Sequence, residues 1–171
     1  MKMKKVLLMV IFLLFVQSIF SAIGYEHFTV QENQVFTEIL VRLSKEFKSI
    51  ENNSKWTTEE ILLNIDNSAI GTIIETMITG YNIDIVLMDK NGTIIYDSDS
   101  GEIGRNILTE PLYQNFTEFV ERFEQSIAVE KRGEGSYAFL ASGMGASQEK
   151  HVMWNTINAF GTEIKVCMIT K

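Results

Sequence analysis

The chain has 171 residues, 46% of them hydrophobic, which is the size and apolar content of one ordinary domain with its own core. A formal net charge of −7 at pH 7 repels nucleic acid and excludes it as a partner. The single cysteine, Cys167, excludes an intramolecular disulfide, and the apolar run around it predicts a buried thiol.

Residues 1–23 have the pattern of an export segment. Three lysines precede the unbroken apolar run of residues 6–16, an order typical of a signal peptide or an N-terminal membrane anchor. Small residues at Ser21 and Ala22 favour cleavage, but an A-x-A pattern is absent and the run is nearly long enough to span a bilayer, so both outcomes stay open. We expect residues 24–171 to form one extracytoplasmic domain, which is periplasmic, secreted or anchored to the outer face of the cytoplasmic membrane.

Residues 24–80 are predicted to be helical. Apolar residues at alternating spacings of four and three line one face of a long first helix, and they are Phe36, Leu40, Leu43, Phe47 and Ile50. Thr57 and Glu60 form a capping box for a second helix, which continues past Met77 to a stop at Gly80. We expect the two helices to pack on each other.

Residues 83–170 are predicted to hold a sheet and one connecting helix. Asn91-Gly92 is the strongest short signal for a hairpin, here between Ile83–Asp89 and residues 93–96. Pro111 suits the first position of a third helix, whose apolar residues recur at helical spacing as far as Ile127.

Three further strands are expected after that helix, which Gly133 and Gly135 are predicted to end. The strands cover residues 136–141, 151–160 and 162–169, and tight glycine turns join them into a meander. Because tight turns cannot join parallel strands, the pattern predicts an α+β domain with an antiparallel sheet.

Four segments of the second half of the chain carry a resemblance to a known family, and they are "VLMDKNGTIIYDSDSGEIGRN", "EPLYQNF", "GEGSYAFL" and "VMWNTINAFGTEIKVCMI". The positions that match the motifs of that family are Asp89, Gly92, Ile94, Tyr96, Asp99, Ile103, Gly104, Gly135, Tyr137, Phe139, Trp154, Gly161 and Val166. In order and spacing these segments resemble the Cache domain, an extracellular relative of the PAS fold, in a stand-alone single-module form. The resemblance covers about half of the chain, and the long N-terminal helices fit the same layout.

This resemblance implies a PAS/Cache-like sheet of about five antiparallel strands flanked by helices, with a small-molecule pocket over one sheet face. It also implies a sensor domain in signal transduction. Since neither a second apolar span nor a signalling domain follows the last strand, the signal is expected to pass through a membrane-bound partner protein. The motif by which larger, two-module Cache receptors bind amino acids is not evident in this sequence. The resemblance therefore implies no particular class of ligand.

The sequence offers no catalytic or metal-binding pattern. Its two histidines, His27 and His151, do not stand in a Ser-His-Asp arrangement, and "SGMGAS" lacks the lysine of a P-loop. "DSDSGE" supplies oxygen atoms at Asp97, Asp99 and Glu102 but lacks the spacing of a calcium loop, which favours a capped turn. We expect a domain that is not an enzyme and has no cofactor or metal.

Seven residues are candidates for binding a small polar metabolite, such as a carboxylate or an amino acid. They are Asp97, Asp99, Arg105, Asn106, Tyr113, Tyr137 and Trp154. Arg105 and Asn106 offer donors for a carboxylate, the aspartates can receive an ammonium group, and the aromatic rings can wall a cavity. Core packing for Tyr137 and Trp154, and a surface ion pair for Arg105, remain the ordinary alternatives.

A second interpretation makes the domain a protein-interaction module. The apolar stripe of residues 36–50 resembles a short coiled-coil seam, which would support a homodimer. Packing within the chain is the alternative role for the same stripe.

Overall fold

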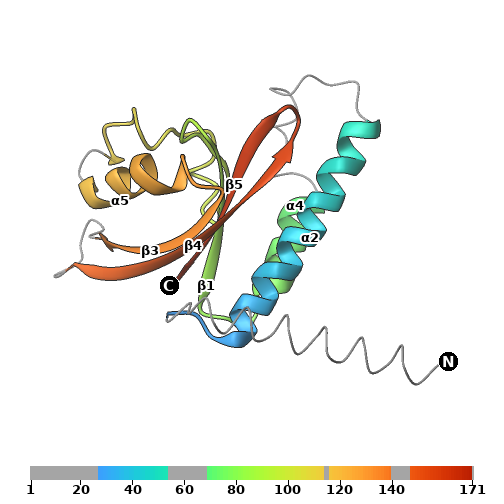
Figure 1. Ribbon diagram of the computed structural model, residues 1–171, viewed down its shortest axis with the longest axis horizontal. Helices are drawn as coiled ribbons and strands as arrows, with labels where there is room; N and C mark the ends of the chain where they lie inside the picture. Colours follow the sequence, from blue (N-terminus) through green and yellow to red (C-terminus); the bar gives the residue numbers. More distant parts are fainter. Residues whose placement is uncertain (1–26, 54–68, 114–115, 140–146, 171) are drawn as a thin grey trace.

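The computed structural model describes residues 27–53, 69–113, 116–139 and 147–170. These residues form one antiparallel sheet in the order β2-β1-β5-β4-β3, with helices on both faces (Figure 1). The strands are β1 (Ile83–Asp89), β2 (Ile94–Tyr96), β3 (Arg132–Phe139), β4 (Gln148–Ala159) and β5 (Thr162–Thr170). The predicted fold class, an α+β domain with a five-stranded antiparallel sheet, flanking helices and a long N-terminal helix, is confirmed.

Two hairpin units and one pairing of distant segments build the sheet. β1 pairs with β2 across the Asn91-Gly92 turn, and β3, β4 and β5 form the predicted meander. β5 then pairs with the whole length of β1, from Ile83 opposite Thr170 to Asp89 opposite Ile164. Because β5 lies between β1 and β4, this pairing joins the two units into a single sheet.

Alternation along β1 and β5 separates two hydrophobic cores. Successive side chains of a strand point to opposite faces of a sheet. In β1, Leu87 belongs to one buried cluster while Val86 and Met88 belong to the other, and Met168 and Cys167 of β5 divide in the same way. Cys167 is buried, as the sequence predicts. The sheet is a wall with a separate core on each side.

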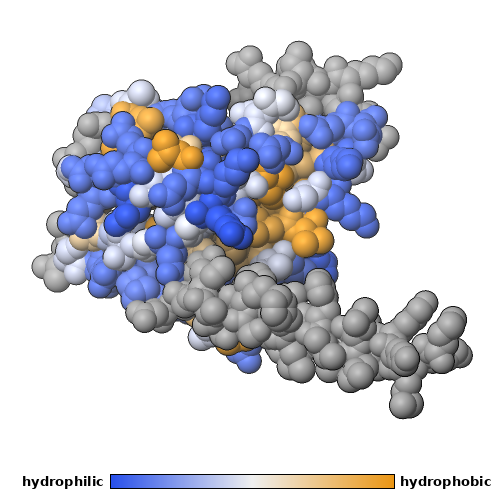
Figure 2. Space-filling model, in the orientation of Figure 1, coloured by the Kyte–Doolittle hydropathy of each residue, from blue (hydrophilic) through white to orange (hydrophobic). Residues whose placement is uncertain are grey.

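Helices α2 (Val30–Asn53) and α4 (Ala69–Ile78) pack on each other and cover one face (Figure 1). Hydrophobic residues show in the gap between this helical pair and the sheet (Figure 2). The buried helical residues are Phe36, Ile39, Leu43, Phe47, Ile70 and Ile74. Because the stripe of α2 packs inside the domain, it is not exposed for the dimer seam of the second interpretation.

The turn between β4 and β5 is anchored to α2. Phe160 and Gly161 both have positive φ, at 54° and 71°, and connect the paired residues Ala159 and Thr162 as a two-residue hairpin turn. Positive φ is strained for a phenylalanine. The Phe160 ring packs edge-on against Phe47 of α2, with ring centroids 5.3 Å apart, and its N–H donates to the Glu51 carboxylate.

The segment that leads into α2 contacts the sheet at the start of β4, beside the C-terminal end of β5. The ring of His27 stacks on that of His151 in β4, with centroids 3.8 Å apart and an interplanar angle of 4°. The backbone N–H of His151 donates to Thr170 Oγ1 at 3.0 Å. The start of α2 and the end of β5 therefore meet at the same end of the domain.

The third helix is shorter than the sequence predicts. It comprises α5 (Thr117–Arg122) and a π-helical turn, η2 (Phe123–Ile127), so Pro111 does not begin it. Pro111 instead opens a turn in which the Tyr113 N–H donates to the Glu110 carbonyl oxygen. Tyr113 is buried here, and its hydroxyl donates to the Glu102 carboxylate.

Gly133 and Gly135 do not end the third helix, because both lie inside β3. At Gly133 an added Cβ would lie 2.3 Å from Cζ2 of Trp154, on the neighbouring strand. Glycine is therefore required here for close packing of the indole, which is a known use of glycine within strands. A glycine in a strand can look like a helix stop when only the sequence is read.

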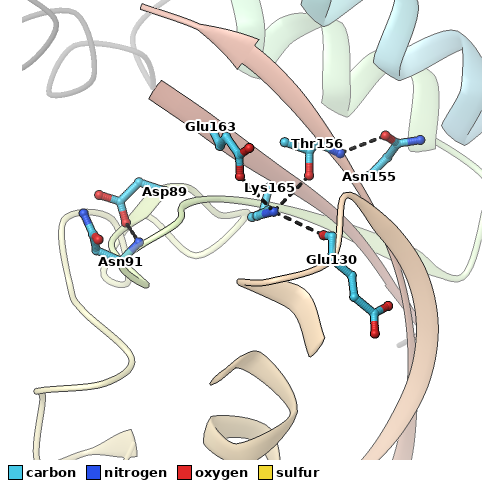
Figure 3. Close-up of polar contacts among 7 residues, drawn as sticks. All are labelled: Asp89, Asn91, Glu130, Asn155, Thr156, Glu163 and Lys165. Carbon is cyan, nitrogen blue, oxygen red and sulfur yellow. Dashed lines mark hydrogen bonds and ion pairs between the residues drawn. The ribbon is translucent and has the colours of Figure 1, made fainter. Parts of the chain in front are cut away.

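A buried lysine fastens the connection before β3 to the sheet. Lys165 of β5 has no exposed surface, and its ammonium group donates to the Glu130 carbonyl oxygen at 3.2 Å and to Thr156 Oγ1 at 3.0 Å (Figure 3). Its third partner is Glu163 Oε2 at 3.3 Å. An ammonium group has three donors, and here each has a partner.

Within the described ranges, no helix has both the length and the apolar character needed to cross a membrane. The export segment at residues 1–23 and the capping box of Thr57 and Glu60 lie outside those ranges.

Replacing Gly133 with alanine is expected to lower the free energy of unfolding by about 1–3 kcal/mol, because the new methyl group overlaps the Trp154 ring. Gly135→Ala is the matched control on the same strand, since its methyl group would lie 3.0 Å from Arg122 Nε, which is a tight contact but not an overlap with a ring. Urea denaturation measures both variants. Equal losses in the two would show that contact with the indole does not explain Gly133.

Candidate ligand-binding site

A cavity of about 390 Å³ lies on the sheet face that α5 covers. Its described lining residues are Val86, Met88, Ile94, Asp97, Asp99, Glu102, Leu112, Tyr113, Phe116, Phe119, Tyr137, Phe139 and Ile169. Three strands supply the buried floor: Val86 and Met88 come from β1, Ile94 from β2 and Tyr137 from β3. Carboxylates stand at the more exposed mouth.

The β1–β2 hairpin positions one side of this cavity. Asp89 Oδ1 accepts the N–H groups of Asn91 at 2.9 Å and of Thr93 at 2.8 Å. Gly92 turns the chain at φ +85°, and an added Cβ there would lie 2.9 Å from Ile107 Cγ1. The hairpin is thereby fixed by its own turn and by the segment packed beneath it.

The chain after β2 folds back beside that strand and carries the carboxylates to the mouth. Gly104, at φ +83°, donates its N–H to the Ile94 carbonyl oxygen at 2.9 Å, and the Ile94 N–H donates to the Arg105 carbonyl oxygen at 2.8 Å. Left-handed backbone of this kind favours glycine. Asp97, Asp99 and Glu102 stand on the loop that these two hydrogen bonds close.

Hydrogen bonds orient each carboxylate, and those to Asp97 and Asp99 come from the loop itself while that to Glu102 comes from Tyr113. Asp97 Oδ1 accepts the Asp99 N–H at 2.8 Å, and Asp99 Oδ1 accepts the Gly101 N–H at 2.9 Å, which makes the capped turn predicted from the sequence. Glu102 Oε2 accepts the Tyr113 hydroxyl. The groups are held in place by neutral donors, so their negative charge is not cancelled.

The environment of Asp97 disfavours its charge. Burial raises the pKa of Asp97 from its usual value of 3.8, and the nearby charges of Asp84 and Glu102 raise it further. Hydrogen bonds from Asp99 and Ser98 act in the opposite direction on the pKa. The net effect is a carboxylate whose ionised form is stabilised by any cation that enters the cavity.

Aromatic rings form part of the cavity wall. Phe116 stacks on Phe139 with centroids 5.4 Å apart, and Phe119 contacts Tyr137 with centroids 5.0 Å apart. Tyr113 stands near Phe116 at 6.5 Å. Such rings give a cavity a large apolar surface, and their faces are electron-rich.

Two hydrogen bonds hold α5 on the outer strand β3 and so fix this wall. Glu118 Oε2 accepts the Ala138 N–H at 2.8 Å, and Arg122 Nε donates to the Ser136 carbonyl oxygen at 3.2 Å. Both backbone groups belong to an edge strand, where exposed backbone would otherwise be free to pair with another chain.

Tyr137 of β3 lines the cavity, with 7% of its surface exposed. No hydrogen-bond partner for its hydroxyl exists among the described residues. Burial raises the pKa of this hydroxyl above its usual 10, with further increases from Cys167 and Asp97. The floor of the cavity therefore presents a neutral, unpartnered hydroxyl group.

The structure brings together four of the seven residues proposed from the sequence. Asp97, Asp99, Tyr113 and Tyr137 line the cavity, and the other three lie outside its described lining. Arg105 Nε donates to the Gly101 carbonyl oxygen at 2.8 Å. The Asn106 side chain donates to the Asn91 carbonyl oxygen at 2.9 Å, and Trp154 packs in the core over Gly133.

Sequence reasoning did not propose Glu102 or the phenylalanines as ligand contacts. Glu102 lies in the same short loop as Asp97 and Asp99, a clustering that the sequence shows but that by itself predicts a capped turn. The sequence pattern places Phe116 and Phe119 in a helical stripe and Phe139 in a strand. Glu102 and the three phenylalanines come together only because β3 folds beneath α5. No short sequence motif predicts that arrangement.

The carboxylates are not arranged for a metal ion. Within the described part of the chain, no group of three or more His, Cys, Asp or Glu side chains is placed to hold one. A hard cation such as calcium needs six to eight converging oxygen ligands.

A second hollow, of about 420 Å³, lies beside the β4–β5 turn. It is more open to solvent, and Lys90 lines it together with Glu51 and Glu163. Charges of both signs and an open shape are ordinary for a protein surface, so we place the candidate site at the cavity under α5.

No protein-family model matches the chain, and no curated protein matches it. Among solved structures, it is similar to an extracellular ligand binding receptor from Desulfohalobium retbaense, at 22% identity and a TM-score of 0.41 over 60% of this chain. The matched part spans only 15% of that receptor chain.

Two further structures are similar over most of their own length. One is a methyl-accepting chemotaxis protein from Vibrio parahaemolyticus, with 9% identity and a TM-score of 0.42, covering 79% of this chain and 88% of that one. The other is the PAS domain of an HTR-like protein from Haloarcula marismortui, with 14% identity and a TM-score of 0.41, covering 59% and 90%. All these TM-scores lie below 0.5, so we base the function on the residues of the cavity.

Replacing Asp97 with asparagine is expected to raise the melting temperature of the ligand-free protein at neutral pH. A carboxyl whose pKa is raised by folding binds its proton more tightly in the folded state, so it opposes folding at any pH above the raised pKa. Asparagine keeps the acceptor oxygen for the Asp99 N–H and removes the charge.

The difference in melting temperature should shrink as the pH falls toward 3.8, where Asp97 becomes protonated in the folded and the unfolded protein alike. Thermal melts between pH 3 and pH 8 measure it. A variant that is less stable than the wild type at neutral pH would contradict the unfavourable environment inferred for this charge.

Proposed function

We propose that this chain is an extracytoplasmic sensor domain, not an enzyme, that binds a small molecule in the cavity under α5 and passes the event to a membrane-bound partner protein. The observation that carries the proposal is the cavity itself. It combines a buried apolar floor, an aromatic wall and a few converging polar groups, the combination expected of a small-molecule site.

The size of the cavity supports the binding of a small molecule, because a core filled by side chains would not leave so large a space. Its volume of about 390 Å³ falls within the range of roughly 300–1,000 Å³ that is usual for ligand pockets. A core of close-packed side chains leaves few voids larger than a water molecule. An opening of this size, lined by Phe119, Tyr137 and Ile169, favours occupation by a ligand.

The sheet provides a direct route from the cavity to α2. Val86 of β1 and Ile169 of β5 line the cavity, while their neighbours Leu87 and Met168 pack in the core that α2 shares. A ligand that shifts either strand therefore changes the surface on which α2 rests. Coupling needs such a contiguous physical element with two arrangements.

The export pattern of residues 1–23 supports an extracytoplasmic location. Positive charge before an apolar run directs the following chain across the cytoplasmic membrane. α2 is the first described helix after that segment, so a change in its packing is well placed to reach a partner at the membrane surface.

Filling the cavity is expected to abolish ligand binding without unfolding the domain. Ile169→Trp adds an indole to the floor at a position that is only partly buried in the ligand-free protein, so the cavity can accept it. The control is Val41→Trp, which adds the same group to α2 at a side chain with 63% of its surface exposed.

The measurement is a thermal-shift screen of the full chain against amines, carboxylates, amino acids, purines and pyrimidines. A ligand that binds only the folded state raises the melting temperature by mass action. A saturable rise in the wild type and in Val41→Trp, but not in Ile169→Trp, supports the proposed site. No rise with any compound, or an equal rise in Ile169→Trp, would remove the cavity from consideration as the ligand site.

Transmission through the sheet predicts an effect away from the ligand. Hydrogen exchange, measured with and without a compound that raises the melting temperature, should slow in α2 as well as in β1 and β5, because these elements share one core. Slower exchange confined to the cavity walls would contradict coupling between the cavity and α2.

A further inference from the structure

We propose that the ligand of this cavity is a small organic cation, an amine or quaternary ammonium compound with an apolar body. This inference rests on the proposed function and specifies its ligand class. The charge of the site is one-sided, because Asp97, Asp99 and Glu102 line the cavity while its described lining contains neither lysine nor arginine.

The three carboxylates retain capacity to bind a positive group. Hydrogen bonds from described residues reach Oδ1 of Asp97, Oδ1 of Asp99 and Oε2 of Glu102. Within the described residues no hydrogen bond reaches the second oxygen of each, and none of the three forms an ion pair. An ionised carboxylate accepts through both oxygens, so acceptors face the cavity mouth without donors.

Three cationic side chains of the described chain are engaged by other groups. Arg105 donates to the Gly101 carbonyl oxygen, Arg122 donates to the Ser136 carbonyl oxygen, and Lys165 is surrounded by its own three partners. Among the described residues, no lysine or arginine forms an ion pair with the three carboxylates. A ligand that brings its own positive charge would supply that counter-ion.

Tyr137 is an independent observation that points to the same ligand. Its side chain is more than nine-tenths buried, lines the cavity and has no described hydrogen-bond partner. The hydroxyl group is accessible from the cavity, so a ligand can bind it. A ligand ammonium group can donate to the tyrosine oxygen, and a ligand hydroxyl group that is also a donor would serve equally.

The aromatic residues of the cavity favour a ligand with an ammonium group over one with a neutral hydroxyl group. Phe116, Phe119 and Phe139 present aromatic rings to the same cavity that holds the carboxylates. The faces of such rings attract positive charge, and aromatic cages are the usual sites for quaternary ammonium groups. Rings and carboxylates together match an alkylammonium or arylalkylammonium ion, whose apolar part covers the floor.

An anionic ligand fits the cavity poorly. The donors in its described lining are the hydroxyl groups of Tyr113 and Tyr137, and that of Tyr113 is already used by Glu102. A carboxylate ligand would therefore meet three like charges and one available hydroxyl. Repulsion between the ligand carboxylate and the carboxylates of the cavity would disfavour binding.

The test uses matched probes that differ in charge and share an apolar body. 2-Phenylethylamine, 2-phenylethanol and 3-phenylpropionate form one series, and hexylamine, hexanol and hexanoate form a second. Choline represents the quaternary ammonium compounds. Thermal shift and titration calorimetry on the full chain, at low and at moderate salt, give the affinity of each probe.

Three isosteric variants remove charge without removing the acceptors that the loop uses, namely Asp97→Asn, Asp99→Asn and Glu102→Gln. The matched control is Glu134→Gln, on the exposed surface of β3 and outside the described lining. Tyr137→Phe removes only the unpartnered hydroxyl group. Circular dichroism confirms the fold of each variant before binding is measured.

We expect cationic probes to bind at least about tenfold more tightly than their neutral and anionic counterparts, since one charge-assisted hydrogen bond corresponds to a factor of that size. At least one of the three carboxylate variants should weaken binding of the cation by about tenfold, while Glu134→Gln leaves it unchanged. Tyr137→Phe should weaken binding and leave the melting temperature of the ligand-free protein equal or higher.

Other results separate the ligand class from the function. Tighter binding of the neutral or anionic probes, blocked by Ile169→Trp, would overturn the cation and leave the sensor cavity in place. Cation binding that is equally weakened by Glu134→Gln would reveal attraction to a generally acidic surface and would overturn the site. If no probe of any charge binds, both the ligand class and the proposed cavity are contradicted.

Discussion

The structure depends on the alternation of side chains along β1 and β5, which places two hydrophobic cores on opposite faces of one sheet. One core is filled by α2 and α4, whose apolar stripes pack closely against the strands. The other is shared between α5, η2 and an open cavity. Because Leu87 and Val86 are adjacent in one strand, neither core can change without moving the wall that supports the other.

The cavity face is maintained at some cost in stability. Asp97 is ionisable in a partly buried position, and the Tyr137 hydroxyl has no partner among the described residues. Substitutions that relieve such features commonly stabilise a protein and harm its function. The closely packed α2 face, with Leu43 and Phe47 buried, offsets this cost and keeps the domain folded while the opposite face stays open.

Sequence patterns predicted the elements whose signals are local. Asn91-Gly92 identified the first hairpin, and the stripe of α2 identified its buried face. Errors arose where a contact with a distant residue determines the local structure. Gly133 lies in a strand because the Trp154 indole needs its space, and Pro111 opens a turn beneath which Tyr113 reaches Glu102. The cavity shares this property, since Phe119 and Glu102 meet only after the sheet has formed.

The stacked pair of His27 and His151 has a practical consequence. The chain contains only these two histidines, and their rings are nearly parallel at 3.8 Å. Each ring must therefore shift the magnetic resonance of the other's protons through its ring current. Two well-separated imidazole signals, visible without any labelling, would give a continuous readout of whether the entry to α2 stays docked on the end of the sheet.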